Sequence, residues 1–296
     1  MWIKSLLIRN LPIHLLLFSL AFFYLSIPLF AQQGELPYIL VSVAPHKYFV
    51  EKIAGDTLKV GLIVPAGASA HTYEPSPKQM LRASTASIWF RIGEIFETKA
   101  IRAIQDHQPN LKVIDLRQGL DLIGGAEECG HSHCHCNAMD LHFWLSPRLG
   151  QIQAETIAKT LIDTYPEHAE LYKTRLKIFQ QELQKLDEKI KSILTTIPNR
   201  HILVSHPAYA YFCRDYDLKQ FSIECEGKDP SPQQLTQLLR DARQYKIKTI
   251  FIQSQYSNKG ARLVAEAIGA RVMNLDPYAE NVPTSLLEIA QAFAEG

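Results

Sequence analysis

The chain has 296 residues, with 31 basic and 30 acidic side chains and a formal net charge of +1 at pH 7. The basic residues are matched by acidic ones and form no basic stripe along the sequence, so nothing suggests nucleic-acid binding. With 47% hydrophobic residues, the chain can bury one large core or two modest ones. The number of cysteines is odd, so at least one is free, bound to metal or paired with another chain. The five are Cys129, Cys134, Cys136, Cys213 and Cys225.

The first 31 residues predict a secretory signal peptide. Lys4 and Arg9 give this segment a positive start, and a strongly apolar run follows from residue 11 to residue 30. We expect cleavage after Ala31, which removes these two basic residues and leaves 29 basic and 30 acidic ones, a net charge of −1. An uncleaved N-terminal anchor is the alternative, because the apolar run is long enough to span a membrane. In either case we expect the folded chain outside the cytoplasm, in the periplasm.

Residues 32–165 are predicted to form an N-terminal α/β lobe. Short apolar runs rich in β-branched residues alternate there with amphipathic stretches, the pattern of buried parallel strands and their connecting helices. The expected strands are Tyr38–Ala44, Leu58–Val64, Ser87–Ile92 and Lys112–Asp115. The expected helices are His46–Ala54, Pro77–Thr85, Glu94–Asp106 and Pro147–Tyr165.

Residues 166–196 predict one long helix that connects two lobes. Pro166 suits the first helical turn, and Pro198 lies beyond the end. At about 1.5 Å per residue such a helix spans roughly 45 Å. Its apolar residues are spaced by four and three and so form one stripe, which favours packing on its own lobes over a coiled-coil partner. The stripe consists of Tyr172, Leu176, Phe179, Leu183, Leu186, Ile190 and Ile193.

The alternation resumes in residues 197–296, which are predicted to form a C-terminal α/β lobe. Its expected strands are Ile202–Ser205, Lys219–Ile223, Thr249–Gln253 and Arg271–Leu275. Its expected helices are Pro207–Asp215, Pro232–Tyr245, Lys259–Ile268 and Ser285–Ala294. The fold class is therefore α/β, with two lobes that each carry a four-stranded, mainly parallel sheet flanked by helices.

Four separated residues follow strands or strand-end loops and could share one metal ion: His71, His142, His206 and Asp276. Ligands in open α/β sheets gather outside the carboxyl ends of the strands, so two residues from each lobe would meet between the lobes. Three imidazoles and one carboxylate complete a tetrahedral shell for a zinc-like ion. A water molecule or a loop residue in place of Asp276 is the alternative.

A second group of possible ligands lies in the segment 124–138, which lacks hydrophobic periodicity. Thiolates and imidazoles together suit zinc and also copper(I), so we expect auxiliary metal binding by this loop. A local disulfide or an insertion without essential function is the alternative. The remaining two cysteines, Cys213 and Cys225, either form a disulfide or are two unpaired, semi-buried small residues. The loop residues are Cys129, His131, His133, Cys134, His135 and Cys136.

The sequence resembles the extracytoplasmic metal-binding proteins of zinc and manganese ABC importers. The resemblance covers nearly the whole mature chain. It is carried by "PAGASAH" ending at His71, "DLHFWLSP" around His142, "HPAYAYF" from His206, "RDYDLKQFSIECEGKDPSP" from Arg214 and "LDPY" from Leu275. It implies two α/β lobes joined by a rigid long helix, with the metal site in the cleft between them.

The same resemblance implies His71, His142, His206 and Asp276 as the ligands. Manganese members typically have a carboxylate where this chain has His206, so the site resembles the zinc type. Some zinc members have a glutamate where this chain has Ala70, and zinc members often carry a His-rich loop. The cysteines of the present loop depart from that pattern.

These features predict a monomeric solute-binding protein that captures Zn2+ and delivers it to a membrane permease with its cytoplasmic ATPase. Binding of manganese, iron or another divalent ion by the same kind of protein is the first alternative. An exported zinc metallohydrolase is the second, although the sequence has no His-Glu-x-x-His, Gly-x-Ser-x-Gly or phosphate-loop motif. A surface adhesin, a role described for some relatives of the family, or a pure metal-storage protein is the third. No enzyme activity and no nucleic-acid partner are expected.

Overall fold

The structure is a computed structural model that describes residues 35–124, 139–224 and 230–296. The predicted signal peptide, the Cys/His-rich loop and Cys225 lie outside these described residues. Among the described helices, none combines the length and the apolar character needed to cross a bilayer. Residues 37–296 form one compact unit, and the description below concerns that unit.

The N-terminal lobe is built on a parallel sheet with the order β2-β1-β3-β4. Its strands are β1 (Tyr38–Val41), β2 (Lys59–Leu62), β3 (Ile88–Arg91) and β4 (Lys112–Asp115). The register pairs Ile39 with Val60 on one side and with Ile88 on the other. The chain therefore reverses its direction of travel across the sheet between β1 and β3, and ligands of such sheets bind at the carboxyl ends beside this point.

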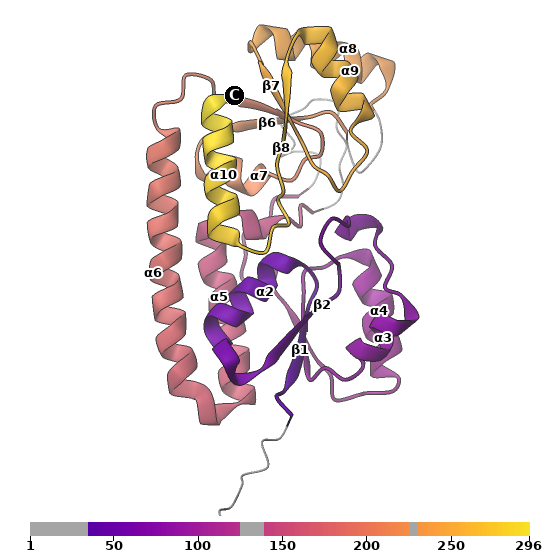
Figure 1. The fold of residues 1–296 in the computed structure, drawn as a ribbon, viewed down its shortest axis with the longest axis vertical. Helices are drawn as coiled ribbons and strands as arrows, with labels where there is room; N and C mark the ends of the chain where they lie inside the picture. The colour runs from indigo at the N-terminus through magenta and orange to yellow at the C-terminus, as the bar shows by residue number, and fades with distance from the viewer. Residues whose placement is uncertain (1–34, 125–138, 225–229) are drawn as a thin grey trace, which may run out of the picture. The chain divides into compact units, whose positions relative to one another are not determined.

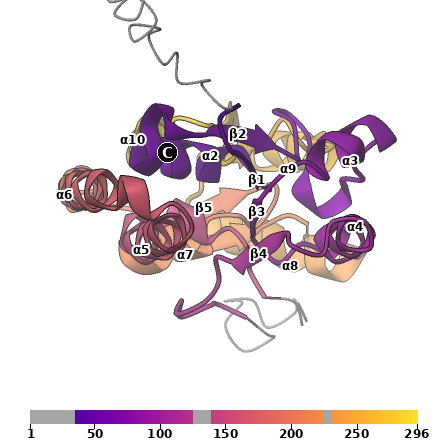
Figure 2. The ribbon, with the colours of Figure 1, turned by 90° about the horizontal axis from the view of Figure 1, so that it is seen from below.

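Helices cover both faces of this sheet. They are α2 (Ala44–Ala54), α3 (Pro77–Ala83), α4 (Ile95–Gln105) and α5 (Pro147–Thr164). Figure 2 shows α2 and α5 on one side of the strands and α3 and α4 on the other. The start of α3 is fixed by local chemistry: Ser76 and Gln79 form a capping box, and Pro77 occupies the first turn.

The C-terminal lobe repeats this arrangement. Its parallel sheet has the order β6-β5-β7-β8, and Leu203 pairs with both Phe221 and Ile250. The strands are β5 (His201–Val204), β6 (Lys219–Ser222), β7 (Thr249–Ile252) and β8 (Arg271–Asn274). The helices are α7 (Ala210–Asp215), α8 (Pro232–Gln244), α9 (Lys259–Ile268) and α10 (Val282–Glu295).

A long helix, α6 (Ala169–Leu194), joins the two lobes. It packs against α2 and α5 of the first lobe and against α10 of the second, as Figure 1 shows. The helix is shorter than the expected 166–196, because residues Pro166–His168 form a 3-10 turn before it. A proline disfavours helical geometry in the residue before it. Tyr165, which precedes Pro166, is accordingly non-helical and separates α5 from this turn.

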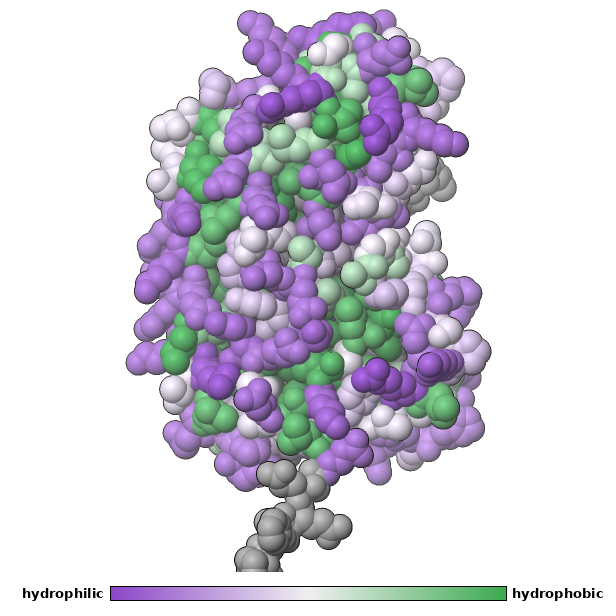
Figure 3. All heavy atoms as spheres, in the orientation of Figure 1, coloured by the Kyte–Doolittle hydropathy of each residue, from purple (hydrophilic) through white to green (hydrophobic). Residues whose placement is uncertain are grey.

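The predicted apolar stripe of α6 faces the lobes. Of its seven members, five are buried and Leu176 and Ile193 are partly buried. The buried ones are Tyr172, Phe179, Leu183, Leu186 and Ile190, and Leu194, beyond the predicted stripe, is buried as well. On the face shown in Figure 3, hydrophilic residues line the outer edge of the molecule along α6 and apolar residues lie inward of it. A coiled-coil partner is not needed to bury this stripe.

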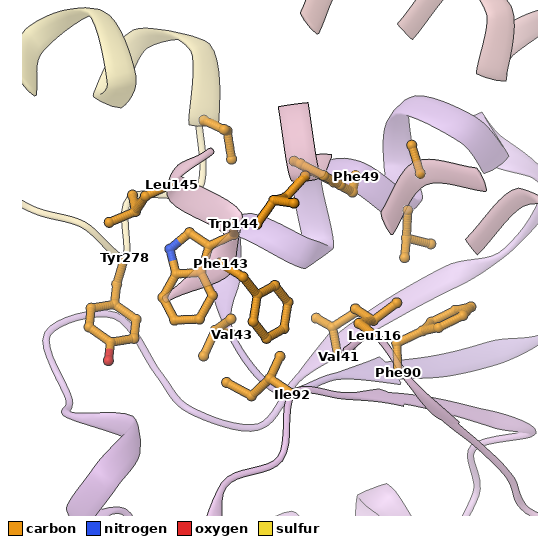
Figure 4. Packing of buried hydrophobic residues seen from close by; sticks show 14 of the residues in the cluster. Val41, Val43, Phe49, Phe90, Ile92, Leu116, Phe143, Trp144, Leu145 and Tyr278 are labelled. Carbon is orange, nitrogen blue, oxygen red and sulfur yellow. The ribbon is translucent and has the colours of Figure 1, made fainter. Parts of the chain in front are cut away.

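One hydrophobic cluster runs through the first lobe, α5, α6 and part of the second lobe. Figure 4 shows a section of it, in which Trp144 and Phe143 pack near Val43 and Ile92. A smaller cluster fills the far side of the second lobe, between its sheet and helices α8 and α9. The predicted fold class, two four-stranded parallel α/β lobes joined by a long helix, is confirmed.

Candidate metal centre

Three of the four expected metal ligands lie together. His71, His142 and His206 each offer a ring nitrogen, and these nitrogens all lie within 4.8 Å of one another. The ring centroids are 5.2 Å apart for His71–His142 and for His71–His206, and 5.4 Å apart for His142–His206. The first two histidines come from the N-terminal half of the chain and the third follows β5, so both lobes contribute to one site.

His71 lies in a short 3-10 turn, Ala70–Thr72, in the connection between β2 and α3. Its Nδ1 is 2.8 Å from Oε1 of Glu94, which is buried at the start of α4. Of the three histidine side chains, that of His71 is 32% exposed, against 3% for His142 and 4% for His206. An ion from solvent therefore meets the site on the side of His71.

The loop that carries Glu94 is held by the buried carboxylate of Glu97. This carboxylate accepts hydrogen bonds from the backbone N–H groups of Ile92 and Gly93, at 2.9 and 2.6 Å, and from the hydroxyl of Ser42. Gly93 has a φ of +104°, a conformation that favours glycine. The end of β3 is thus fixed in a shape that turns Glu94 toward His71.

His142 directly precedes the 3-10 turn Phe143–Leu145 that leads into α5. Both its backbone N–H and its Nδ1 lie 2.8 Å from Oδ1 of Asp140, two residues earlier. The carboxylate accepts from both groups, which fixes the backbone and the ring of His142 together. Tyr211 of α7 donates to the carbonyl of Asp140 at 2.7 Å, so α7 also supports this segment.

His206 comes two residues after β5. Its Nδ1 lies 2.7 Å from Oε1 of Glu224, which follows the neighbouring strand β6. The ring is stacked on Tyr256, with centroids 4.1 Å apart and an angle of 15° between the planes. Its Nε2 is buried and has no hydrogen-bond partner among the described residues. A buried ring nitrogen without a partner is costly, which is consistent with a role in binding an ion.

The three histidines share one arrangement: each presents Nδ1 to a carboxylate, which leaves Nε2 as the ligand atom. Metal-binding histidines usually donate their second ring N–H to such a partner, which fixes the tautomer and raises the basicity of the ligand. The carboxylates belong to Glu94, Asp140 and Glu224. We did not expect them from the sequence, although Asp140 stands two residues before His142 and the others follow predicted strands.

Electrostatics in the site differ between the histidines. Burial by itself would lower the pKa of His71, but the hydrogen bond and charge of Glu94 outweigh it, and this pKa is raised. Burial lowers the pKa of His206 well below its usual range, and positive charge on His142 or His71 would lower it further. His206 therefore stays neutral, the form that binds metal, to lower pH than His71 does.

Asp276, the fourth expected ligand, does not belong to this group within the described part of the chain. Its Oδ1 accepts hydrogen bonds from the backbone N–H of Tyr278, at 2.9 Å, and from Nε2 of Gln255, at 2.7 Å. The carboxylate therefore caps the turn after β8, and its role as a ligand stays a prediction. The sequence does indicate this turn-capping role, because an aspartate in a turn commonly accepts a hydrogen bond from the backbone N–H two residues later.

That turn brings a tyrosine to the site instead. The Tyr278 hydroxyl lies 3.2 Å from Nε2 of His142, and its ring contacts those of His142 and Trp144. Figure 4 shows Tyr278 beside the Trp144 indole. Trp144 in turn donates from Nε1 to the carbonyl of Pro277 at 2.8 Å. Neither aromatic residue was expected at the site from the sequence.

Cys213 is buried in α7 and is free among the described residues. Burial raises the pKa of its thiol, as expected for a structural cysteine. The expected alternative, a disulfide with Cys225, falls outside the described residues, as do Cys129, His131, His133, Cys134, His135 and Cys136 of the Cys/His-rich loop.

Two parallel α/β lobes joined by a long helix, with imidazoles from both lobes converging on one point, define a two-lobed metal-binding protein. The chain belongs to the family described as zinc-uptake complex component A, periplasmic, whose model matches residues 39–292. A putative metal-binding protein of Chlamydia trachomatis serovar D is 37% identical over 257 residues, which cover 86% of this chain and 90% of that relative.

Solved structures agree with this membership. A crystal structure of ZnuA is 37% identical in sequence, with a TM-score of 0.82, and the match covers 88% of this chain and 99% of that one. A ZnuA deletion mutant with zinc bound is also 37% identical, with a TM-score of 0.80, and the match covers 88% and 97% of the two chains.

Proposed function

We propose that the protein captures Zn2+ outside the cytoplasm and delivers it to the membrane permease of an ABC importer. The observation that carries the proposal is the convergence of three imidazoles whose Nδ1 atoms each meet a carboxylate. The remaining nitrogen ligands suit zinc, whereas manganese prefers oxygen ligands. The family's description as a zinc-uptake component and the zinc in the related ZnuA mutant support the same ion.

The ligands in this proposal are His71, His142 and His206. His142 and His206 are buried and held by their carboxylates, so they form a fixed pair into which the ion fits. His71 is the exposed ligand, so it meets the arriving ion first and releases it last. Asp276 remains the proposed fourth ligand from the sequence, with water or a loop residue as the alternative.

The role of the protein in this proposal is transport and not catalysis, in agreement with a family of solute-binding components. We propose that a signal peptide ending at Ala31 is removed on export and that the mature protein acts as a monomer. The loaded protein docks on a permease that a separate cytoplasmic ATPase drives. The Cys/His-rich loop is proposed as an auxiliary metal-binding segment.

Equilibrium dialysis of the purified mature protein against zinc, manganese and copper, with metal analysis of the retained ion, tests the proposal. We expect one tightly held zinc per chain and weaker retention of manganese. Tighter binding of manganese than of zinc would contradict the assignment of the ion.

Three variants locate the site in the same measurement. His142→Ala should abolish tight binding, while deletion of residues 127–136 should leave it intact. Asp276→Asn removes the charge of the proposed fourth ligand, so zinc binding should weaken by more than about tenfold, although the asparagine oxygen can still accept from the backbone N–H of Tyr278. A smaller loss would give the fourth position to water or a loop residue. His107→Ala, at an exposed position in the first lobe, is the matched control.

A further inference from the structure

The hydroxyl of Tyr278 occupies a position that matters for the ion, because it lies 3.2 Å from Nε2 of His142. This ring nitrogen is the one left for the metal, since Nδ1 of the same ring is 2.8 Å from the Asp140 carboxylate. The carboxylate has no proton to give, so it accepts from Nδ1–H. Nε2 then carries the lone pair, and the phenolic O–H of Tyr278 donates to it.

A neutral imidazole has only one lone pair in the plane of its ring. Nε2 of His142 can therefore accept the proton of Tyr278 or bind a metal ion, but it cannot do both at once. The hydrogen bond from Tyr278 must break whenever an ion binds His142. The phenol is in this sense a competitor of the ion.

Both lobes hold Tyr278 close to His142. Its backbone N–H donates to Asp276, and the carbonyl of the preceding Pro277 accepts from the Trp144 indole at 2.8 Å. Its ring packs on that indole, with centroids 5.3 Å apart, and the residue is only 6% exposed. Because the ring is fixed in this way, the hydroxyl has to find a new partner where it stands once the ion has bound.

That second partner is present. The hydroxyl of Tyr256 is within hydrogen-bonding reach of that of Tyr278. Ser69 donates to Tyr256 at 3.1 Å, and the Tyr256 ring is stacked on His206. The O–H of Tyr278 can therefore turn from Nε2 of His142 to the oxygen of Tyr256 by rotation about a single C–O bond.

We propose that Tyr278 is a retention-determining residue that competes with zinc for His142, with Tyr256 as the alternative acceptor. This proposal deepens the proposed function and rests on it. The phenol stabilises His142 when the ion leaves, and so favours release of the ion to the permease. Tyr256 has the opposite effect, because it accepts the displaced O–H when the ion is bound. Asp276 also holds the turn that carries Tyr278.

Two substitutions of the same kind test this, because their effects should have opposite signs. Tyr278→Phe keeps the ring and removes the competing O–H, so zinc should bind about 3- to 10-fold more tightly. Tyr256→Phe keeps the stack on His206 but removes the alternative acceptor, so zinc should bind more weakly by a similar factor. The measurement is a competition titration against a chromophoric zinc chelator, with the rate of zinc loss to excess chelator as a second readout. We expect slower loss from Tyr278→Phe.

Tyr48→Phe is the matched control, because this phenol of α2 packs against Phe179 of α6 and not against a histidine of the site. It should leave zinc affinity unchanged. In addition, the ring nitrogens of His142 should report the hydrogen bond directly: the 15N resonance of Nε2 in the zinc-free protein should move in Tyr278→Phe toward the value of an unbonded imidazole nitrogen. A merely structural role of Tyr278 would not change this resonance selectively.

Unchanged or weaker zinc binding by Tyr278→Phe, with tight binding by the unaltered protein, would overturn the competition and leave the proposed function standing. Loss of affinity by tenfold or more would instead make the phenol a ligand or a support of the bound ion. If the unaltered protein retained no zinc, the proposed function would fall, and the role of Tyr278 with it.

Discussion

At the scale of single residues, the ligands themselves were easier to predict than the groups that orient them. His142 and Asp140 are two positions apart, so their contact is local. His206 and Glu224 are 18 positions apart and meet because β5 and β6 are adjacent strands. The sequence showed that both residues follow strands, but not that these strands are neighbours. Strand order, which the pattern of apolar residues does not contain, is what pairs His206 with its carboxylate.

Asp140→Asn tests the contribution of such a carboxylate. The substitution keeps the size of the side chain and removes the charge that holds Nδ1–H of His142. We expect zinc affinity to fall by about 10- to 100-fold, the usual effect of losing a hydrogen-bond partner of a metal ligand. Asp121→Asn is the control, since that carboxylate is 93% exposed and forms an ion pair with Arg214, not with a histidine of the site. A loss of affinity in both variants would point to long-range charge instead of orientation.

His46 makes a second prediction at this scale, on stability in acid. The residue is fully buried, bonded to Gln153 at 2.7 Å, and surrounded by Phe49, Phe143 and Trp144. Burial lowers its pKa from 6.5 to about 4, although the Gln153 hydrogen bond opposes this. In the unfolded chain the imidazole takes up a proton near its ordinary pKa, whereas in the folded chain it does so only near pH 4.

Folding stability should therefore be highest above about pH 6.5 and fall as the pH drops toward 4, with a contribution of about 3 kcal/mol from this one group. Urea unfolding between pH 7 and 4 measures it. His46→Gln should flatten this part of the profile, whatever its effect on stability at pH 7. In His107→Gln, which alters an exposed side chain, the slope should match that of the unaltered protein. If the unfolding free energy of His46→Gln depended on pH as steeply as that of the unaltered protein, His46 would not be the cause of the loss of stability in acid.

At the scale of helices and strands, prediction from the sequence came close to the structure. Each of the eight expected strands is present among the described residues, and the observed ends lie within a few positions of the expected ones. Buried parallel strands are short apolar runs with polar ends, and prolines mark the starts of α3, α5 and α8, so both signals are local. The 3-10 turns at Ala70–Thr72 and Phe143–Leu145 were missed. They carry or follow ligands, and their shape depends on contacts between distant segments.

The stripe of α6 can be tested by truncating one of its side chains. Phe179 is fully buried and meets Phe49 of α2 edge to face, with ring centroids 5.0 Å apart. Phe179→Ala should lower the free energy of unfolding by about 3–5 kcal/mol, because it removes buried apolar area and leaves a cavity. Ile178→Ala, at a position that is 50% exposed, is the control and should change it by less than about 0.5 kcal/mol. Similar losses of unfolding free energy in Phe179→Ala and Ile178→Ala would mean that both faces of the helix are buried to the same extent.

At the scale of the whole described unit, the two lobes are not separate bodies on a hinge. The larger hydrophobic cluster includes Trp89 of the first sheet, Leu183 of α6, and Phe251 and Phe293 of the second lobe. Helix α10 belongs to the second lobe by its place in the chain but packs on α6. The sequence predicted the connecting helix, but not that the core itself passes from one lobe to the other. Only contacts far apart in sequence create this continuity.

A continuous core predicts how the protein responds to its ion. Opening a hinge between the lobes would expose apolar residues of α6 and α10 to water, at a cost of about 25 cal/mol per Å2. We therefore expect small movements near His71, the exposed ligand, and not a rotation of the lobes. Small-angle X-ray scattering with zinc and with excess chelator should give the same radius of gyration within error. A smaller radius with zinc would show domain closure, and the cluster would then have to rearrange when the ion binds.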